Sequence, residues 1–341
     1  MEGEFLETPE IVFETAEKAP SGAFSSSSAK HSLQELYTFW IFFQKISKGL
    51  AERVPARSSL ASGLPQKEFL SFLVVVWVKS GGNATIVNMK KIVIGNWKMN
   101  PATLLEARKI FSKVKKTASS CKKVHTVICP PFLYLSDLAS KSSKESLALG
   151  AQDTSSLESV GSYTGFLSPL MVKNIGAQYV IIGHSERRRE GETDEMINKK
   201  ILASLSIGLK VIFCVGEKER GHDGHFLEFV KQQIHLGLQG VSKKSLQNVL
   251  IAYEPVWAIG AENAILPRDL HQMKIYIRKV LSEFFGPSAV VKVPVIYGGT
   301  VNPENVELLL LAGEVDGFLV GRASLNPKDF SAILEVANAS K

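Results

Sequence analysis

A glutamate stands at the end of an apolar run in the most informative stretch of this chain. The run extends from Val249 to Ala252, Tyr253 and Glu254 follow it, and Pro255 comes next. A strand that ends on an ionisable residue and opens into an apolar, glycine-containing loop can present a general base to a substrate. The same pattern also fits a solvated glutamate at a strand end, because catalytic carboxylates are a minority.

Four other apolar runs end in residues that could do chemistry. These residues are Asn96, Lys98, His184, Gly298, Gly299, Thr300 and Gly321. Each alone has an ordinary explanation, as a solvated lysine, a structural histidine or a turn glycine. Five such ends in one chain favour a shared site, because the carboxyl ends of barrel strands meet at one face.

The elements that would position these residues alternate from Ile92 onward. Near-continuous Val/Ile/Leu runs, typical of parallel strands covered on both faces, are followed by helical patterns. We expect strands near 92–97, 124–130, 147–153, 179–184, 210–216, 249–255, 293–299 and 317–321, and helices near 102–118, 133–140, 168–175, 193–206, 225–238, 267–284, 302–311 and 327–337. Eight such units in about 250 residues predict an α/β fold, a (β/α)8 barrel. A doubly wound open sheet is the alternative, but no glycine-rich dinucleotide fingerprint follows the first run.

Six motifs together resemble the triosephosphate isomerase family. They occur in the family's order between Met89 and about Ala337: GNWKMN at 95–100, YVIIGHSERR at 179–188, CVGE at 214–217, AYEPVWAIG at 252–260, YGGTV at 297–301 and DGFLVG at 316–321. The resemblance implies a TIM barrel that interconverts dihydroxyacetone phosphate and glyceraldehyde 3-phosphate in glycolysis and gluconeogenesis. It implies proton transfer through an enediolate, with neither a cofactor nor a metal.

The resemblance also implies roles for the polar residues at the strand ends. Glu254 is the base, and His184 polarises the carbonyl as a neutral imidazole. Lys98 is the cation, and Asn96 orients the substrate and the lysine. Glu186 resembles the family's carboxylate near that lysine. An altered barrel that binds phosphate and serves as a scaffold is the alternative function.

Substrate binding is expected from further positions of the same motifs. Trp97 adjoins Lys98, and the phosphate is expected at backbone N–H groups of Gly260, Thr300, Gly321 and Arg322. The stretch from Pro255 to about Ile265 resembles the family's mobile lid. Its first hinge is Pro255, Val256 and Trp257, and Ile259 and Leu319 are expected to clamp apolar side chains over Glu254.

Four positions depart from the family's common pattern. Glu262 adds a carboxylate to the lid, and Thr300 replaces a serine. Arg322 stands where a second glycine is common, so its N–H remains available only if the backbone there does not require a positive φ. Phe166 replaces a glutamate that pairs with an arginine like Arg187. We nevertheless expect a homodimer through the loop Tyr163–Phe166.

Composition limits the partners and the compartment. The 341 residues carry a formal net charge of +7, with 45% hydrophobic and 21% charged residues. Lysine and arginine are scattered rather than gathered in a basic block, so we expect no nucleic-acid partner. Three cysteines without paired or metal-ligand spacing fit a reducing, cytoplasmic location. The apolar run Phe69–Val78 is too short to span a membrane, so no membrane partner is expected.

Residues 1–88 differ from the rest of the chain. They begin acidic and include the serine run Ser25–Ser28 and the aromatic cluster Leu36–Phe43. Neither a signal peptide nor a transit peptide has this composition. We expect an N-terminal extension over 1–88, either disordered or a gene-model artefact with Met89 as the true start, and an isomerase barrel over 89–341.

Overall fold

The computed structural model describes residues 90–142, 146–221, 224–259 and 265–340. All of them belong to one structural unit, Val87–Lys341. The expectations for residues 1–88, Gly260 and Glu262 lie outside the described residues.

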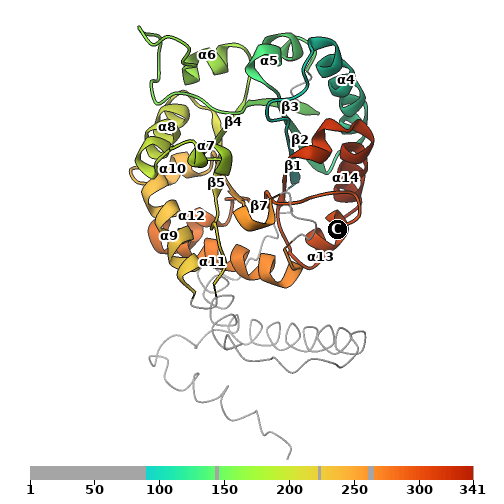
Figure 1. Ribbon diagram of the computed structural model, residues 1–341. Helices are drawn as coiled ribbons and strands as arrows, with labels where there is room; N and C mark the ends of the chain where they lie inside the picture. Colours follow the sequence, from blue (N-terminus) through green and yellow to red (C-terminus); the bar gives the residue numbers. More distant parts are fainter. Residues whose placement is uncertain (1–89, 143–145, 222–223, 260–264, 341) are drawn as a thin grey trace, which may run out of the picture. The chain divides into compact units, whose positions relative to one another are not determined.

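Eight parallel strands form a closed barrel in the order of the sequence (Figure 1). They are β1 Lys91–Asn96, β2 Val124–Cys129, β3 Leu147–Ala151, β4 Tyr179–Ile182, β5 Lys210–Val215, β6 Val249–Tyr253, β7 Val295–Tyr297 and β8 Gly317–Val320. Strand β1 pairs with both β2 and β8, which closes the ring. This confirms the predicted (β/α)8 barrel and excludes the open doubly wound sheet.

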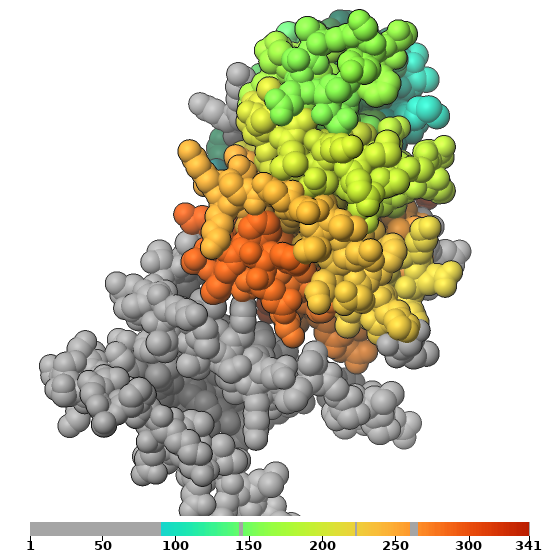
Figure 2. Space-filling model, turned by 90° about the vertical axis from the view of Figure 1, so that its left-hand side faces the viewer, coloured from blue at the N-terminus to red at the C-terminus, as the bar shows by residue number. Residues whose placement is uncertain are grey.

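Helices connect successive strands and surround the barrel (Figure 1). They are α4 Leu104–Ser120, α5 Phe132–Ala139, α6 Pro169–Asn174, α7 Ser185–Arg189, α8 Asp194–Ser206, α9 His225–Gly237, α10 Lys243–Leu246, α11 Pro267–Phe285, α12 Pro287–Val290, α13 Val306–Leu311 and α14 Pro327–Ala339, with the 3₁₀ helices η1 Val256–Ala258 and η2 Arg322–Leu325. On the side of the barrel seen in Figure 2, the colours run from green at the top through yellow to orange below, so the segments on this side follow one another in sequence order. Within the ranges that the structure describes, no helix is long and apolar enough to cross a membrane.

Local capping explains where several helices begin. Ser168 and Thr193 cap α6 and α8 by accepting from the backbone N–H of Met171 and Met196. The expected helix over 302–311 begins only at Val306, so this expectation was wrong by four residues. The reason lies in the preceding turn, where the side chains of Asn302 and Asn305 each accept from the other residue's N–H at 2.9 Å.

The strands are buried on both faces, and this produces two apolar layers. Residues such as Ile94, Ile181 and Leu319 fill the inside of the barrel. Others, such as Val93 and Phe318, pack outward against the helices. Because both faces are filled with apolar side chains, the polar side chains collect at the strand ends, as barrel enzymes require.

Candidate active site

The carboxyl ends of the strands surround a cavity of about 650 Å³. The residues expected from the sequence that line it are Asn96, Trp97, Lys98, His184, Glu254, Ile259, Thr300, Leu319, Gly321 and Arg322. Glu186 and the hinge residues Pro255, Val256 and Trp257 do not line it but adjoin residues that do. The barrel therefore brings residues separated by more than 200 positions to one cavity.

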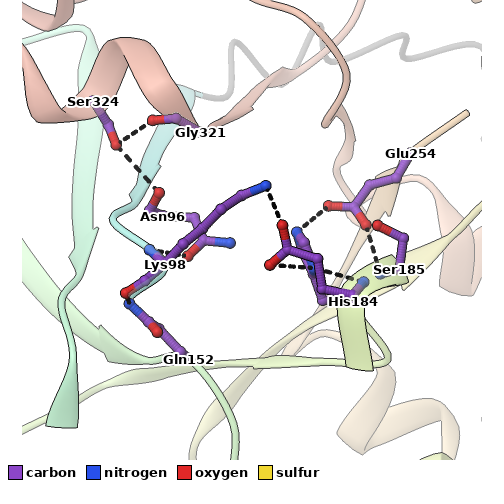
Figure 3. A network of polar contacts seen from close by, with 9 residues as sticks. Asn96, Lys98, Gln152, His184, Ser185, Glu254, Gly321 and Ser324 are labelled. Carbon is purple, nitrogen blue, oxygen red and sulfur yellow. Dashed lines mark hydrogen bonds and ion pairs between the residues drawn. The ribbon is translucent and has the colours of Figure 1, made fainter. Parts of the chain in front are cut away.

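Glu254 follows β6 directly, and its side chain is 2% exposed. Its Oε2 accepts a hydrogen bond from the backbone N–H of Ser185 at 3.3 Å. Its Oε1 is buried, with no hydrogen-bond partner among the described residues. The imidazole Nε2 of His184 lies 3.3 Å from this oxygen (Figure 3). A buried acceptor that is left unpaired inside a cavity is available to a ligand.

Two glycines make room for Glu254. A Cβ atom on Gly298 would lie 2.6 Å from Glu254 Cγ, and one on Gly216 would lie 2.0 Å from the Glu254 backbone oxygen. Real Cβ atoms do not approach other atoms this closely, so a side chain at either position would displace Glu254. These glycines were not predicted to position Glu254, although the motifs YGGTV and CVGE contain them.

His184 caps the short helix α7 with its own ring. Its Nδ1 accepts from the backbone N–H of Glu186 at 3.2 Å. A nitrogen that accepts a hydrogen bond carries no proton, so in the neutral ring the proton is assigned to Nε2. This nitrogen is the one beside Glu254, and it can donate to an oxygen bound in the cavity.

Lys98 is held at both its backbone and its amine. Its backbone is left-handed, with φ of 52°, and its N–H donates to Asn96 Oδ1 at 3.0 Å. Its Nζ donates to Glu186 Oε1 at 2.6 Å. Gln152 Nε2 donates to the backbone oxygens of Lys98 at 2.8 Å and of Cys129 at 2.9 Å. Gln152 was not predicted, although its place directly after β3 was a signal.

Glu186 stays ionised beside the lysine. Burial raises the pKa of its carboxyl, but the hydrogen bond from Lys98 and the positive charges of Lys98 and Arg189 bring that pKa below its ordinary value. The Lys98 ammonium is therefore oriented by a permanent negative charge.

The ends of β7 and β8 present backbone groups to the cavity. The Thr300 hydroxyl donates to the Ala258 oxygen at 2.9 Å, and the Ser324 hydroxyl donates to the Gly321 oxygen at 2.6 Å. These contacts fix the loops, while the N–H groups of Gly321 and Arg322 find no acceptor in the described part of the chain. Arg322 does not have a positive φ, so an arginine fits this backbone without strain.

A buried glutamate holds the segment that follows Glu254. Glu217, 1% exposed, accepts from the Tyr253 hydroxyl at 2.9 Å and from Trp257 Nε1 at 2.9 Å. Its backbone oxygen accepts from the Val256 N–H at 2.9 Å. Glu217 was not predicted as a functional residue, although the motif CVGE ends on it.

The loop expected at a dimer interface carries exposed aromatic side chains. Tyr163 is 53% exposed and Phe166 is 59% exposed. Their ring centroids lie 6.0 Å apart. Arg187, whose expected glutamate partner is replaced by Phe166, pairs within the chain with Asp153 at 3.1 Å. The loop thus presents an apolar surface rather than a charged one.

The arrangement of the described residues also bears on metal binding. Over the residues that it places, no group of three or more His, Cys, Asp and Glu side chains is arranged to hold a metal ion. The polar groups of the cavity instead suit acid–base chemistry on an anionic ligand, since they combine a carboxylate, an imidazole and an ammonium.

Comparison with known proteins agrees with this geometry. The model of the family described as Triosephosphate isomerase matches residues 91–337. The triosephosphate isomerase of Natranaerobius thermophilus is 44% identical over 250 residues, which are 73% of this chain and 96% of the relative. That of Dictyoglomus thermophilum is 42% identical over 249 residues, 72% of this chain and 99% of the relative. The chain belongs to the triosephosphate isomerase family.

Proposed function

We propose that this isomerase interconverts dihydroxyacetone phosphate and glyceraldehyde 3-phosphate with Glu254 as its base. The carboxylate takes a proton from the carbon beside the carbonyl, and the electron pair moves onto the carbonyl oxygen. The His184 Nε2–H donates to that oxygen and stabilises the enediolate. The hydroxyl proton of the enediolate then passes from one oxygen to the other, and Glu254 returns its proton to the neighbouring carbon, so that the carbonyl and the hydroxyl group exchange places. This division between a carboxylate base and a neutral imidazole is the one established for the family.

The observation that carries the assignment is that Glu254 Oε1 accepts no hydrogen bond from any residue that the structure describes. It is buried, lies 3.3 Å from His184 Nε2, and lines the cavity. No feature of the described residues favours the alternative of a catalytically silent scaffold.

The remaining polar groups suit the substrate's negative charge. The Lys98 ammonium, oriented by Glu186, balances the charge that develops on the enediolate, while Asn96 holds the Lys98 backbone. The N–H groups after β7 and β8 suit the phosphate, because backbone donors can approach it closely. Ile259 and Leu319 line the cavity and would keep water from the base.

Replacing Glu254 by glutamine tests the proposal. The Glu254→Gln variant keeps the shape of the side chain but cannot accept the proton, so kcat for glyceraldehyde 3-phosphate should fall by at least about 10²–10⁴-fold. Exposed Glu283 on α11 gives the matched control, and Glu283→Gln should retain wild-type kcat. Circular dichroism would verify that both variants are folded. Near-wild-type activity of Glu254→Gln would refute the assignment.

We also propose that the isomerase is a cytoplasmic homodimer. The exposed rings of Tyr163 and Phe166 support association, since large apolar side chains at a loop tip favour burial against a partner. The structure contains three free thiols, those of Cys121, Cys129 and Cys214. Free thiols are compatible with a reducing compartment.

A further inference from the structure

The side chain of Arg322 is a feature of the cavity that the proposed chemistry does not use. Arg322 is exposed and lines the same cavity as Lys98, His184 and Glu254. The proposed function uses only its backbone N–H. Its guanidinium is nevertheless a permanent positive charge at the edge of a site for an anionic substrate.

The backbone of Arg322 lies close to Lys98. A Cβ atom on the preceding residue, Gly321, would lie 3.5 Å from Lys98 Cε and 4.0 Å from Lys98 Nζ. Consecutive Cα atoms are about 3.8 Å apart, so the Arg322 Cα lies within about 9 Å of the Lys98 ammonium. An arginine side chain that starts there can reach a phosphate bound at the N–H groups of Gly321 and Arg322.

The structure gives Arg322 no carboxylate partner, counting only the residues whose positions it describes. Asp329 also lines the cavity but makes no ion pair with it. Lys98, by contrast, is paired with Glu186 at 2.6 Å. The guanidinium is therefore available to an anion from solution.

We propose that the Arg322 guanidinium binds the substrate phosphate and adds a side-chain ligand to the backbone N–H groups. The inference rests on the proposed function, which puts the phosphate beside Gly321 and Thr300. A guanidinium binds phosphate oxygens through two parallel N–H bonds, which a backbone N–H cannot do. Arg322 therefore favours the dianionic form of the substrate phosphate and strengthens substrate binding before the chemical step.

Loss of the Arg322 guanidinium should affect substrate binding more than the chemical step. The phosphate is remote from the reacting carbons, so a contact with it stabilises the bound substrate and the transition state to a similar extent. Losing such a contact raises KM more than it changes kcat. Because Arg322 is exposed, added salt should weaken its contribution.

The experiment compares three variants of the full-length chain. Arg322→Met removes the charge, Arg322→Lys keeps it without the paired N–H groups, and Lys328→Met removes an exposed charge that does not line the cavity. Calorimetry gives the Kd for inorganic phosphate, and steady-state kinetics give KM and kcat at two ionic strengths. Circular dichroism verifies folding.

We expect Arg322→Met to raise Kd and KM together by about tenfold, which corresponds to the loss of one charge-assisted contact. Arg322→Lys should lie between it and the wild type, and Lys328→Met should differ from the wild type by less than about twofold. Salt should weaken phosphate binding less in Arg322→Met than in the wild type.

A folded Arg322→Met variant that binds phosphate as tightly as Lys328→Met would overturn the inference and leave the isomerase assignment intact. The converse result is also distinguishable. If the wild type bound phosphate in an Arg322-dependent manner but did not isomerise the substrate, the proposed function would fail and the assignment of Arg322 as a phosphate ligand would be supported.

Discussion

At the scale of single residues, the site depends on glycines as much as on residues with polar side chains. Gly298 approaches Glu254 so closely that a methyl group there would lie 2.6 Å from Cγ and 3.1 Å from Oε1. The Glu254 side chain can therefore occupy its position only because residue 298, in the loop after β7, is a glycine.

Gly298→Ala should displace the base. We expect kcat/KM to fall by about 10²-fold, because a shift of about 1 Å in a catalytic group can have this effect. Gly240→Ala is the control: this glycine has φ of 77° between α9 and α10, away from the cavity, so its replacement should reduce stability but not kcat/KM. Steady-state kinetics and thermal unfolding measure the two effects. Equal kinetic losses in both variants would argue against a local cause.

His125 makes the barrel sensitive to acid. Burial, followed by the charges of Lys210 and Lys90, lowers the pKa of His125 to about 4 from 6.5. Its Nε2 is 2.8 Å from the Tyr179 hydroxyl, and Lys210 Nζ is 3.4 Å from the same hydroxyl. Between pH 6.5 and 4 the unfolded chain binds a proton that the folded chain does not, so stability falls as pH falls, by up to about 3 kcal/mol.

Replacing His125 by glutamine tests this pH dependence. Thermal unfolding of the wild type and of His125→Gln should be compared at pH 7 and pH 4.5. The variant has no proton to bind at this position, so its Tm should fall less between the two pH values. An identical fall in both proteins would show that other groups cause the acid sensitivity.

The main catalytic assignments could be made from the sequence, whereas their supports could not. Glu254, His184 and Lys98 each end an apolar run within a distinctive motif. Glu217 and Gln152 act through partners 23 to 54 positions away, and only the closed barrel brings these partners together. Contacts of this range leave no periodic pattern in a single sequence.

At the scale of elements, the sequence predicted the position of every strand but extended several of them too far. The run expected as a strand over 249–255 forms a strand only over Val249–Tyr253, and that expected over 293–299 forms one only over Val295–Tyr297. The apolar pattern continues into the site residues, whereas pairing stops where the neighbouring strand ends. The short helices α7, α10 and α12 were missed, because four or five residues are too few to show a helical period.

Glu217 links β5, β6 and η1, so it should matter for both stability and turnover. Glu217→Ala leaves the buried hydroxyl of Tyr253 and the indole N–H of Trp257 without an acceptor, which should cost about 2–4 kcal/mol of unfolding free energy. Because the segment held by Glu217 follows the base directly, we also expect kcat/KM to fall about tenfold.

The control for Glu217→Ala is Tyr276→Phe. It removes one hydrogen bond to the Leu227 oxygen, between α11 and α9 and away from the cavity. This variant should lose about 1 kcal/mol of stability without a change in kcat/KM. Urea unfolding and steady-state kinetics of both proteins separate the two effects. If Glu217→Ala lost stability alone, its proposed link to the base would be wrong.

At the scale of the whole molecule, association should depend on the aromatic loop. Phe166→Asp places a carboxylate where an apolar contact is proposed, so the dimer dissociation constant should rise by about 100-fold or more. Phe229→Asp on α9, which also replaces an exposed phenylalanine, should leave association unchanged. Sedimentation equilibrium measures both constants. Unaltered association of Phe166→Asp would place the interface elsewhere.

The left-handed backbone of Lys98 has a consequence for engineering this enzyme. Lys98 and Glu314 are the non-glycine residues with positive φ in the described ranges, and such a conformation costs roughly 1–2 kcal/mol. A design method that chose residues by backbone preference alone would place glycine or asparagine at this position and so remove the ammonium group. Optimisation for heat resistance would thus select, at this one residue, a more stable protein that lacks the ammonium of the proposed active site. A redesign of the sequence should therefore keep lysine at position 98 because of its proposed role in the active site.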